Sequence, residues 1–240
     1  MKDTIARPLK GNRASIGNRA SMLPRGGAHT KDALLRVALE HYQRHGYEAT
    51  SLRAITQELG LTVAATYYHF KSKEELLVAA YRRNLEYLQV AHDNIAATLS
   101  SPERLWTFVQ LHTCLQRSDE GTGRQPYSAA LLLDSIPEEY AATLRVIMCR
   151  IRDRLRGIIT AGIRAKSFDK VNTTAAAYAI FGMSHSVDLW FRPGGALTME
   201  QVATMYADFA LRIVGARPVR NRADMQRLTR SALAAAGALK

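Results

Sequence analysis

The sequence predicts an all-α protein, and three observations support this fold class. No stretch of useful length alternates polar and apolar residues with the period of a strand. Apolar residues recur instead at helical spacing, three and four positions apart, in about nine segments. The 240 residues are 47% hydrophobic and 22% charged, which is enough to build a real core in one or two globular domains.

The net charge of +12 favours a polyanionic partner, nucleic acid first and acidic lipid second. Basic residues are concentrated at both ends of the chain, where acidic residues are scarce. We interpret residues 1–28, which contain several Gly and Pro, as a flexible basic arm, and residues 216–240 as a basic C-terminal tail with a weak helical pattern. One interpretation is an arm that lies along DNA or enters the minor groove. The alternatives are a disordered solubilising tail or a mis-assigned start codon.

Two cysteines, Cys114 and Cys149, lie far apart in apolar helical stretches without CxxC spacing. Small buried thiols in a reducing cytoplasm explain them best. No apolar run approaches the length of a membrane span, and the basic N-terminus lacks the apolar core of a secretory signal. We therefore expect a cytoplasmic protein with no membrane partner.

The first predicted helix opens at Thr30, a candidate N-cap, and ends at Gly46. Two shorter helices follow within the segment 50–73. Ser51 can cap the first of them, Gly60 supplies the left-handed residue that ends it, and Thr62 can cap the second. The second helix is too short to be stable alone, so its neighbours must hold it.

This arrangement is typical of a helix-turn-helix, in which one helix braces a second that enters the DNA major groove. A generic αα-hairpin in a bundle is the alternative. A cluster at the end of the second helix favours DNA, because it supplies groups that bind phosphate. The cluster contains Tyr67, Tyr68, His69, Lys71 and Lys73. We assign residues 29–73 to a helix-turn-helix DNA-binding domain.

The remaining elements form a second predicted helical domain, residues 74–215. Ser72 caps the first of its helices, Pro102 and Pro137 open two others, and Thr198 caps the last one, which Gly215 ends. The predicted helices span 74–99, about 102–115, 127–135, 138–166, 172–191 and 199–214, with a loop over 118–126.

Residues 30–77 resemble the DNA-binding domain of the TetR family of bacterial transcriptional repressors. Order and spacing over a long motif carry this resemblance. Its residues are Thr50, Ser51, Leu52, Arg53, Ile55, Gly60, Leu61, Thr62, and Tyr67 through Leu76. The run Asp188-Leu189-Trp190-Phe191-Arg192-Pro193-Gly194-Gly195 is similar to a subgroup that includes regulators of steroid and fatty-acyl breakdown.

The resemblance implies a homodimeric repressor that binds a palindromic double-stranded DNA operator through its third helix and is released by a small-molecule effector. It also implies that residues 74–215 are the ligand-binding and dimerisation domain. It also implies that Tyr67 and Lys73 bind phosphates. Val63 and Ala64 stand where many members have a polar or basic residue and Gly, so few polar side chains remain to read bases. The candidate DNA-binding residues are Thr50, Arg53, Thr62, Ala65, Thr66, Tyr67, Tyr68, His69 and Lys73.

Apolar and aromatic residues of the later helices are candidates for an effector cavity. They are Trp106, Cys114, Tyr127, Met148, Ile151, Phe181, His185 and Trp190. The effector is expected to be an acyl-CoA or another apolar or aromatic compound; an acidic group would make Arg145, Arg152 or Arg192 candidate partners. The candidate dimer seam contains Phe181, Leu189, Val202, Met205, Tyr206 and Phe209.

No catalytic constellation or nucleotide-binding loop is recognisable, so we expect no enzyme activity and no cofactor. His41 and His45 have the spacing of a metal pair but lack a third ligand, so no metal is expected. Two other classes remain open. One is a helical small-molecule-binding protein or enzyme without specific DNA binding, and the other is a non-specific nucleic-acid or membrane-surface binder that uses the basic ends.

Overall fold

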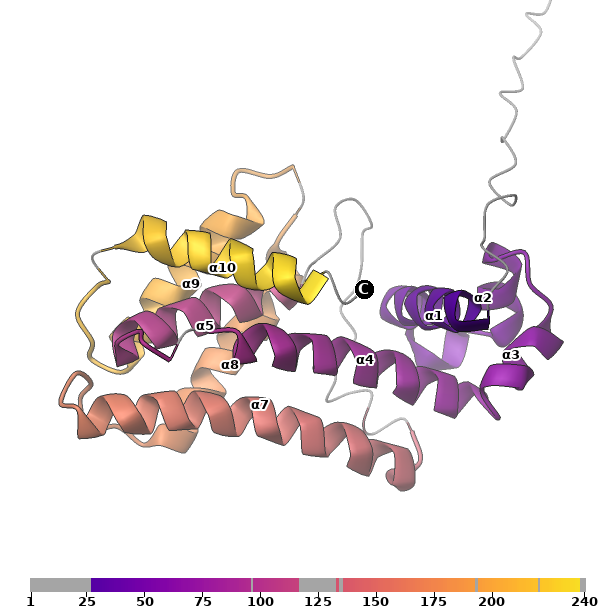
Figure 1. The fold of residues 1–240 in the computed structure, drawn as a ribbon, viewed down its shortest axis with the longest axis horizontal. Helices are drawn as coiled ribbons and strands as arrows, with labels where there is room; N and C mark the ends of the chain where they lie inside the picture. Colours follow the sequence, from indigo (N-terminus) through magenta and orange to yellow (C-terminus); the bar gives the residue numbers. More distant parts are fainter. Residues whose placement is uncertain are drawn as a thin grey trace, which may run out of the picture.

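A computed structural model describes residues 27–95, 97–116, 133, 136–192, 194–219 and 221–237, and within these ranges it contains helices and no strand (Figure 1). The prediction of an all-α fold is confirmed. The helices are α1 (Gly27–Ala49), α2 (Leu52–Glu58), α3 (Val63–His69), α4 (Lys73–Asp93), α5 (Ser101–Gln116), α7 (Glu138–Arg164), α8 (Thr173–Trp190), α9 (Met199–Ile213) and α10 (Arg222–Gly237).

Helix α2 is held at both ends, and α3 at its start, by residues that the sequence singled out. The Ser51 hydroxyl accepts a hydrogen bond from the backbone N–H of Ala54 at 3.1 Å. The Thr62 hydroxyl accepts one from the N–H of Ala65 at 3.3 Å. Gly60 between the two helices has φ +65°, a conformation that is strained for a residue with a Cβ. These contacts fix the turn of the helix-turn-helix.

The first helix departs from prediction at its start. It begins at Gly27, so Thr30 lies inside the helix and does not cap it. Gly46, with φ 80° and ψ 172°, interrupts the helical backbone at the predicted end. Leu34, Val37 and Tyr42 on the buried side of α1 form one core with Ile55 of α2. This core supports helices that are too short to stand alone.

Helix α4 joins the end of the molecule that α1, α2 and α3 form to the rest (Figure 1). Ser72 is its N-cap: its hydroxyl accepts from the N–H of Glu75 at 3.2 Å, and the Glu75 carboxylate accepts from the N–H of Lys71 at 2.6 Å. The helix contacts α1 near its start and α5, α7 and α10 further along. A change in the angle of α4 therefore moves the first three helices relative to the others.

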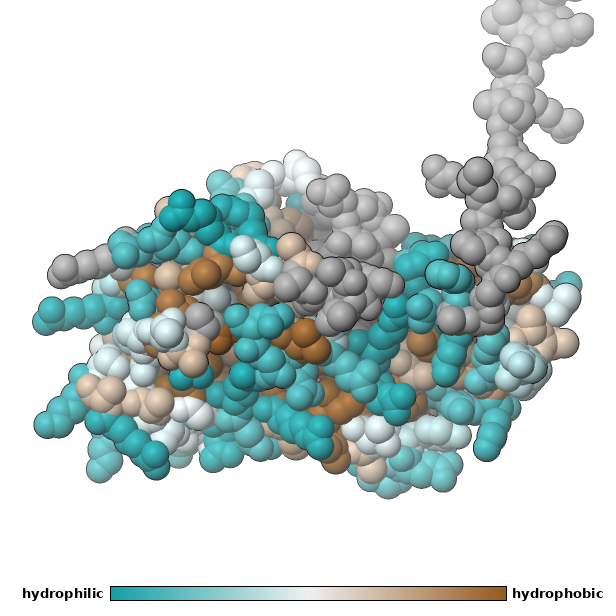
Figure 2. All heavy atoms as spheres, in the orientation of Figure 1, coloured by the Kyte–Doolittle hydropathy of each residue, from teal (hydrophilic) through white to brown (hydrophobic). Residues whose placement is uncertain are grey.

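The larger helical layer is organised around α5, which packs against α7, α8, α9 and α10. Trp106 of α5 is fully buried, and its indole N–H donates to Asp208 of α9 at 2.9 Å. Gly162 lets the chain that follows α7 fold back onto the end of this helix, since a Cβ at Gly162 would lie 2.1 Å from the Phe168 ring. Polar side chains cover the outward sides of the helices, and apolar atoms show mainly between them (Figure 2).

Residues 216–240, predicted as a basic tail, contain helix α10. Met225, Thr229 and Ala232 are buried against the layer of α5, and the Thr229 hydroxyl donates to the side chain of Gln110 at 2.7 Å. The arginines of this helix face outward, as the Arg230–Glu200 ion pair at 2.9 Å illustrates. Most of the predicted arm 1–28, the loop 118–126 and most of the helix 127–135 lie outside the described residues.

Candidate functional site

The outward face of α3 carries aromatic side chains where a surface helix usually carries charge. Ala64, Tyr67 and Tyr68 are exposed at spacings of three and four, so they share one face, and Lys71 continues it beyond the helix. Tyr67 is 56% exposed and Tyr68 is 85% exposed. His69 packs edge-on against the Tyr68 ring, with centroids 5.0 Å apart. The face presents flat rings and hydroxyl groups to the surroundings.

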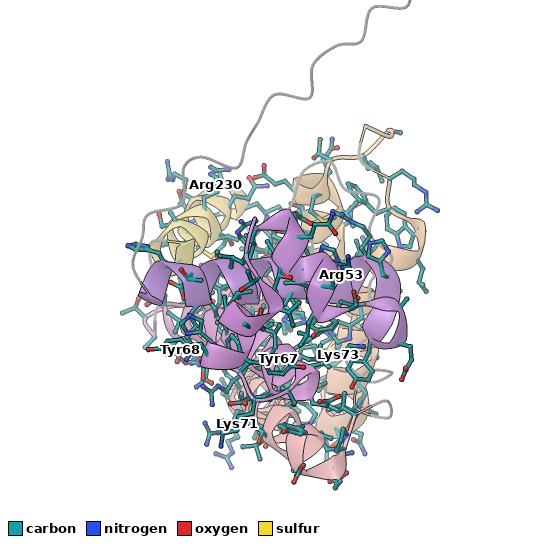
Figure 3. The ribbon with its side chains drawn as sticks, turned by 90° about the vertical axis from the view of Figure 1, so that its right-hand side faces the viewer. Arg53, Tyr67, Tyr68, Lys71, Lys73 and Arg230 are labelled. Carbon is teal, nitrogen blue, oxygen red and sulfur yellow. The ribbon has the colours of Figure 1, made fainter. Side chains whose placement is uncertain are left out.

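Cationic side chains surround this face. Arg53 projects from α2, Lys71 lies in the turn after α3 and Lys73 opens α4, so all three are on the end of the molecule that carries Tyr67 and Tyr68 (Figure 3). The Lys73 ammonium lies 4.0 Å from the centroid of the Tyr47 ring. The Tyr42 hydroxyl donates to the Lys73 carbonyl at 3.1 Å, which fixes the backbone from which the ammonium projects. Such a border can hold anions on either side of an inserted helix.

Two predicted DNA-binding residues face the wrong way. Thr50 is 3% exposed, and its hydroxyl donates to the Gly46 carbonyl at 2.8 Å. Thr66 is fully buried on the inward side of α3, because the exposed positions 64, 67 and 68 place it opposite them. Neither side chain can reach a base or phosphate in this conformation, so both assignments are corrected to structural ones.

The other predicted positions lie at the surface or its border. Arg53 and Thr62 are exposed, and Ala65 and His69 are partly exposed. The Thr62 hydroxyl already accepts the capping hydrogen bond, which limits what it can offer to DNA. Ala64 was missed as a candidate, although its spacing from Tyr67 and Tyr68 would have identified it.

Comparison with known proteins agrees with this geometry. A family model described as "Bacterial regulatory proteins, tetR family" matches residues 34–80, and one described as "Tetracyclin repressor-like, C-terminal domain" matches residues 98–214. The chain belongs to the TetR family of transcriptional regulators. The helix-turn-helix of α2 and α3 is therefore the DNA-binding module of a TetR regulator.

Three relatives illustrate the similarity. The transcriptional repressor KstR2 of Rhodococcus jostii is 25% identical over 191 residues, which are 78% of this chain and 91% of KstR2. The crystal structure of PfmR from Thermus thermophilus is 28% identical, covers 78% of this chain and 99% of that one, and superposes with a TM-score of 0.64. AibR in complex with isovaleryl coenzyme A and operator DNA is 22% identical with a TM-score of 0.66, covers 78% and 99% of the two chains, and shows the shared fold.

The predicted effector residues are not gathered around one space. Trp106 is enclosed in the core and hydrogen-bonded to Asp208, so it fills the core and does not line a cavity. Trp190 is 43% exposed, with its indole N–H donating to the Tyr206 hydroxyl at 3.0 Å. Burial raises the pKa of the half-buried Cys114 thiol to about 12, so this cysteine is an inert packing group. Tyr127 lies outside the described residues.

The C-terminal region contains cavities that bear on this prediction. A cavity of about 190 Å³ between α4 and α7 is lined by Gln89, His92, Arg150, Ile151 and Arg154. A larger cavity of about 530 Å³ lies where α9 begins, beside α10; Met205 and Gln226 are among its lining residues. Of the predicted effector residues, Ile151 lines the first cavity, while Met148, Phe181 and His185 line neither.

A row of three histidines crosses the C-terminal core, and sequence reasoning did not single out two of them. Nε2 of His92 lies 3.3 Å from Nδ1 of His112, whose Nε2 lies 3.4 Å from Nε2 of His185. His92 also stacks on Phe108, with centroids 3.9 Å apart. Burial lowers the pKa of His92 to about 3 and that of His112 well below its ordinary value, so both rings are neutral. In the sequence, the apolar residues at helical spacing around these two histidines were the signal that could have indicated their burial.

The outer face of α8 and α9 exposes apolar side chains. Leu189 is 74% exposed and Phe209 is 40% exposed, while Tyr178, at 57%, holds Arg152 of α7 through its hydroxyl at 3.0 Å. Phe181 and Met205 are half-buried. Val202 is fully buried and Tyr206 nearly so, which places them in the core of one chain and corrects their assignment to the seam.

In the described part of the chain, no group of three or more side chains has the arrangement of a metal site. His41 instead lies 2.8 Å from the Glu58 carboxylate, which accounts for one member of the predicted histidine pair. None of the described helices combines the length and apolar character needed to cross a membrane.

Proposed function

We propose that the protein is a homodimeric repressor that inserts α3 into the major groove of a palindromic operator and is released by a small apolar or acyl effector. The observation that carries the proposal is the exposed Tyr67–Tyr68 face with its cationic border. Water makes no favourable contact with the apolar surface of exposed aromatic rings, whereas in a groove these rings contact sugars and thymine methyl groups. Arg53, Lys71 and Lys73 would bind the phosphates beside the groove.

The dimer proposal rests on the apolar side chains that one chain leaves exposed on α8 and α9. Leu189, Trp190 and Phe209 are large residues of the kind that protein interfaces bury. A second copy packed there would set two α3 helices on one side of the assembly. Reading one palindrome then requires a separation of roughly 34–36 Å, one turn of DNA.

The effector proposal rests on relatives and on the position of α4. AibR binds isovaleryl coenzyme A and operator DNA, and KstR2 is a ketosteroid regulator. Because α4 contacts both the first helix and the effector-side helices, a ligand that shifts α4 would alter the separation of the two α3 helices. The effector can lower DNA affinity only by as much as it prefers the non-binding geometry.

A footprint on the intergenic DNA upstream of the protein's own gene tests the proposal. We expect protection of one inverted repeat in the presence of excess competitor DNA. A non-specific binder would give uniform, salt-sensitive retention without a footprint. A small-molecule-binding protein or enzyme without specific DNA binding would give neither retention nor a footprint.

Sedimentation of Leu189→Asp tests the dimer, and we expect this variant to be a monomer. Glu139→Lys, an exposed change on α7, is the control and should remain dimeric.

A thermal-shift screen with acyl-CoAs, sterols and aromatic acids addresses the effector class. A stabilising compound should also release the footprint at similar concentration, since release and binding are linked. Stabilisation by acyl-CoAs without any release would contradict the proposed mode of regulation.

A further inference from the structure

The cavity between α4 and α7 has an unusual wall. It contains two arginines, Arg150 and Arg154, and a buried imidazole, His92. Arg154 forms an ion pair with Asp93. Among the described contacts, Arg150 makes no hydrogen bond or ion pair. The immediate surroundings therefore hold more positive than negative charge. Such an excess beside a partly enclosed space favours an anion.

The buried histidine supplies a second and independent observation. His92 is 1% exposed, and its Nδ1 has no hydrogen-bond partner among the described residues, while its Nε2 meets His112. An unpartnered polar atom at such depth is costly, and most buried polar atoms have a partner. His92 lines the cavity, but its Nδ1 is closed to water in this structure, so a group bound there can satisfy this nitrogen only after a small shift of the surrounding side chains.

We propose that this cavity binds an oxyanion, a carboxylate or phosphate group of the effector, through His92 Nδ1, Arg150 and Arg154. The inference rests on the proposed function only in calling the ligand an effector. About 190 Å³ is less than the space that drug-sized ligands occupy, so the cavity takes the anionic group and not a whole acyl-CoA. Arginine forks match the planar geometry of carboxylate oxygens and also bind phosphate.

The histidine row gives the site a route to α8. An oxyanion accepts a hydrogen bond from His92 only if the proton is on Nδ1, which leaves Nε2 as an acceptor. The ring of His112 must then donate from Nδ1 and accept at Nε2, and His185 must donate from its Nε2. Occupying the cavity thus sets the tautomer of a side chain on the outer face of α8, some distance from the ligand.

Nuclear magnetic resonance of protein labelled with ¹⁵N in its histidine rings tests the site without DNA. The probes are inorganic phosphate and butyrate, with butyramide as the uncharged control. We expect saturable shifts of the His92 ring with at least one of the anions and none with butyramide. A response to phosphate alone or to butyrate alone identifies the group, whereas no response to either anion overturns the site.

Arg150→Gln tests the recognition, because this exposed residue can change without disturbing the core. We expect the dissociation constant to rise about tenfold or more, as hydrogen bonds to charged groups predict. Arg164→Gln removes the same charge from an exposed position on the same helix and should leave binding unchanged. Equal weakening by both variants would reduce the effect to general attraction and overturn the site.

The relay has its own readout. Binding at the cavity should shift His112 and His185 toward the tautomers given above, and His185→Gln should leave the affinity for the anion within about twofold. A His92 shift without any change at His185 overturns the relay and leaves the site standing. Footprint assays separate the two proposals: anion binding by a protein with no footprint leaves this site intact and refutes the repressor.

Discussion

The DNA-binding end of the molecule comprises α1, α2, α3 and the start of α4, and the effector end comprises the rest of α4 with α5, α7, α8, α9 and α10. The two ends are stabilised in different ways. Helices α2 and α3 have seven residues each, and hydrogen-bonded caps and a positive-φ glycine define their ends. Helices α7 and α9 have 27 and 15 residues, and each is stabilised by a buried apolar face. Short helices need particular residues at particular positions, whereas long amphipathic helices need only the right pattern.

This difference explains where polar groups are found. At the DNA-binding end, Tyr67, Tyr68 and the basic residues lie at the surface, and the core is apolar apart from a few threonines and Tyr42. In the effector end, His92, His112 and Gln110 lie inside the core and bond to one another or to hydroxyl groups. One region concentrates its chemistry on its outside and the other inside.

Replacing Trp106 with Ala should give the largest effect on stability, because the side chain is fully buried in the effector end. We expect a loss of about 3–5 kcal/mol in the free energy of unfolding, from the lost packing and the lost hydrogen bond to the Asp208 carboxylate. Urea unfolding at one protein concentration measures it. Trp190→Ala, at a half-exposed tryptophan, should cost clearly less; equal losses would contradict the assignment of Trp106 to the core.

Acid should destabilise the effector end first. The pKa values of His92 and His112 are lowered on folding, so the unfolded chain binds more protons below about pH 6.5 and stability falls as pH falls. The slope is about 1.4 kcal/mol per pH unit for each histidine, and for His92 it continues to about pH 3.

At the DNA-binding end, the acid-sensitive group is a carboxylate instead of an imidazole. The hydrogen bond from Tyr47 lowers the pKa of Glu74, so its contribution is present above the ordinary carboxyl range and lost only at lower pH. Urea unfolding between pH 7.5 and 5.5 therefore reports the histidines. His92→Phe should reduce the slope, and an unchanged slope would show that His92 does not titrate as described.

Lys73→Ala should weaken operator binding modestly and evenly across sequences. Loss of one phosphate contact lowers the slope of log affinity against log salt by about one. Gel shifts at several salt concentrations measure the slope. Lys170→Ala removes an equal charge from an exposed loop of the effector end and should leave it unchanged; an unaltered slope for Lys73→Ala would refute its phosphate role.

Thr66→Val should have the smallest effect, and it separates core from groove. The Thr66 hydroxyl is buried without a hydrogen-bond partner among the described residues, so a methyl group of similar shape should stabilise the fold by up to about 1 kcal/mol. Operator preference should not change. A shift in preference at one base pair would restore Thr66 as a base reader.

Local rules made much of the DNA-binding end predictable. Ser51, Gly60, Thr62 and Ser72 act within three or four residues of their own positions, so their roles can be inferred without knowing the fold. Thr30 shows the limit of such rules, since the helix extends past it to Gly27. Which side of α3 faces inward depends on how this helix packs against its neighbours, α2 above all, and this is why Thr66 was misassigned.

The sequence by itself determined the all-α class, the helix-turn-helix, most helix starts and the TetR resemblance, because each depends on spacing along the chain. Tertiary structure alone decided that Trp106 and Val202 belong to the core and Leu189 to the surface, and that residues 222–237 form a packed helix. It also brought His92, His112 and His185 into one row from three different helices. Contacts between residues 20 and 73 positions apart depend on how helices pack, and helical periodicity does not encode which partner an apolar face will meet.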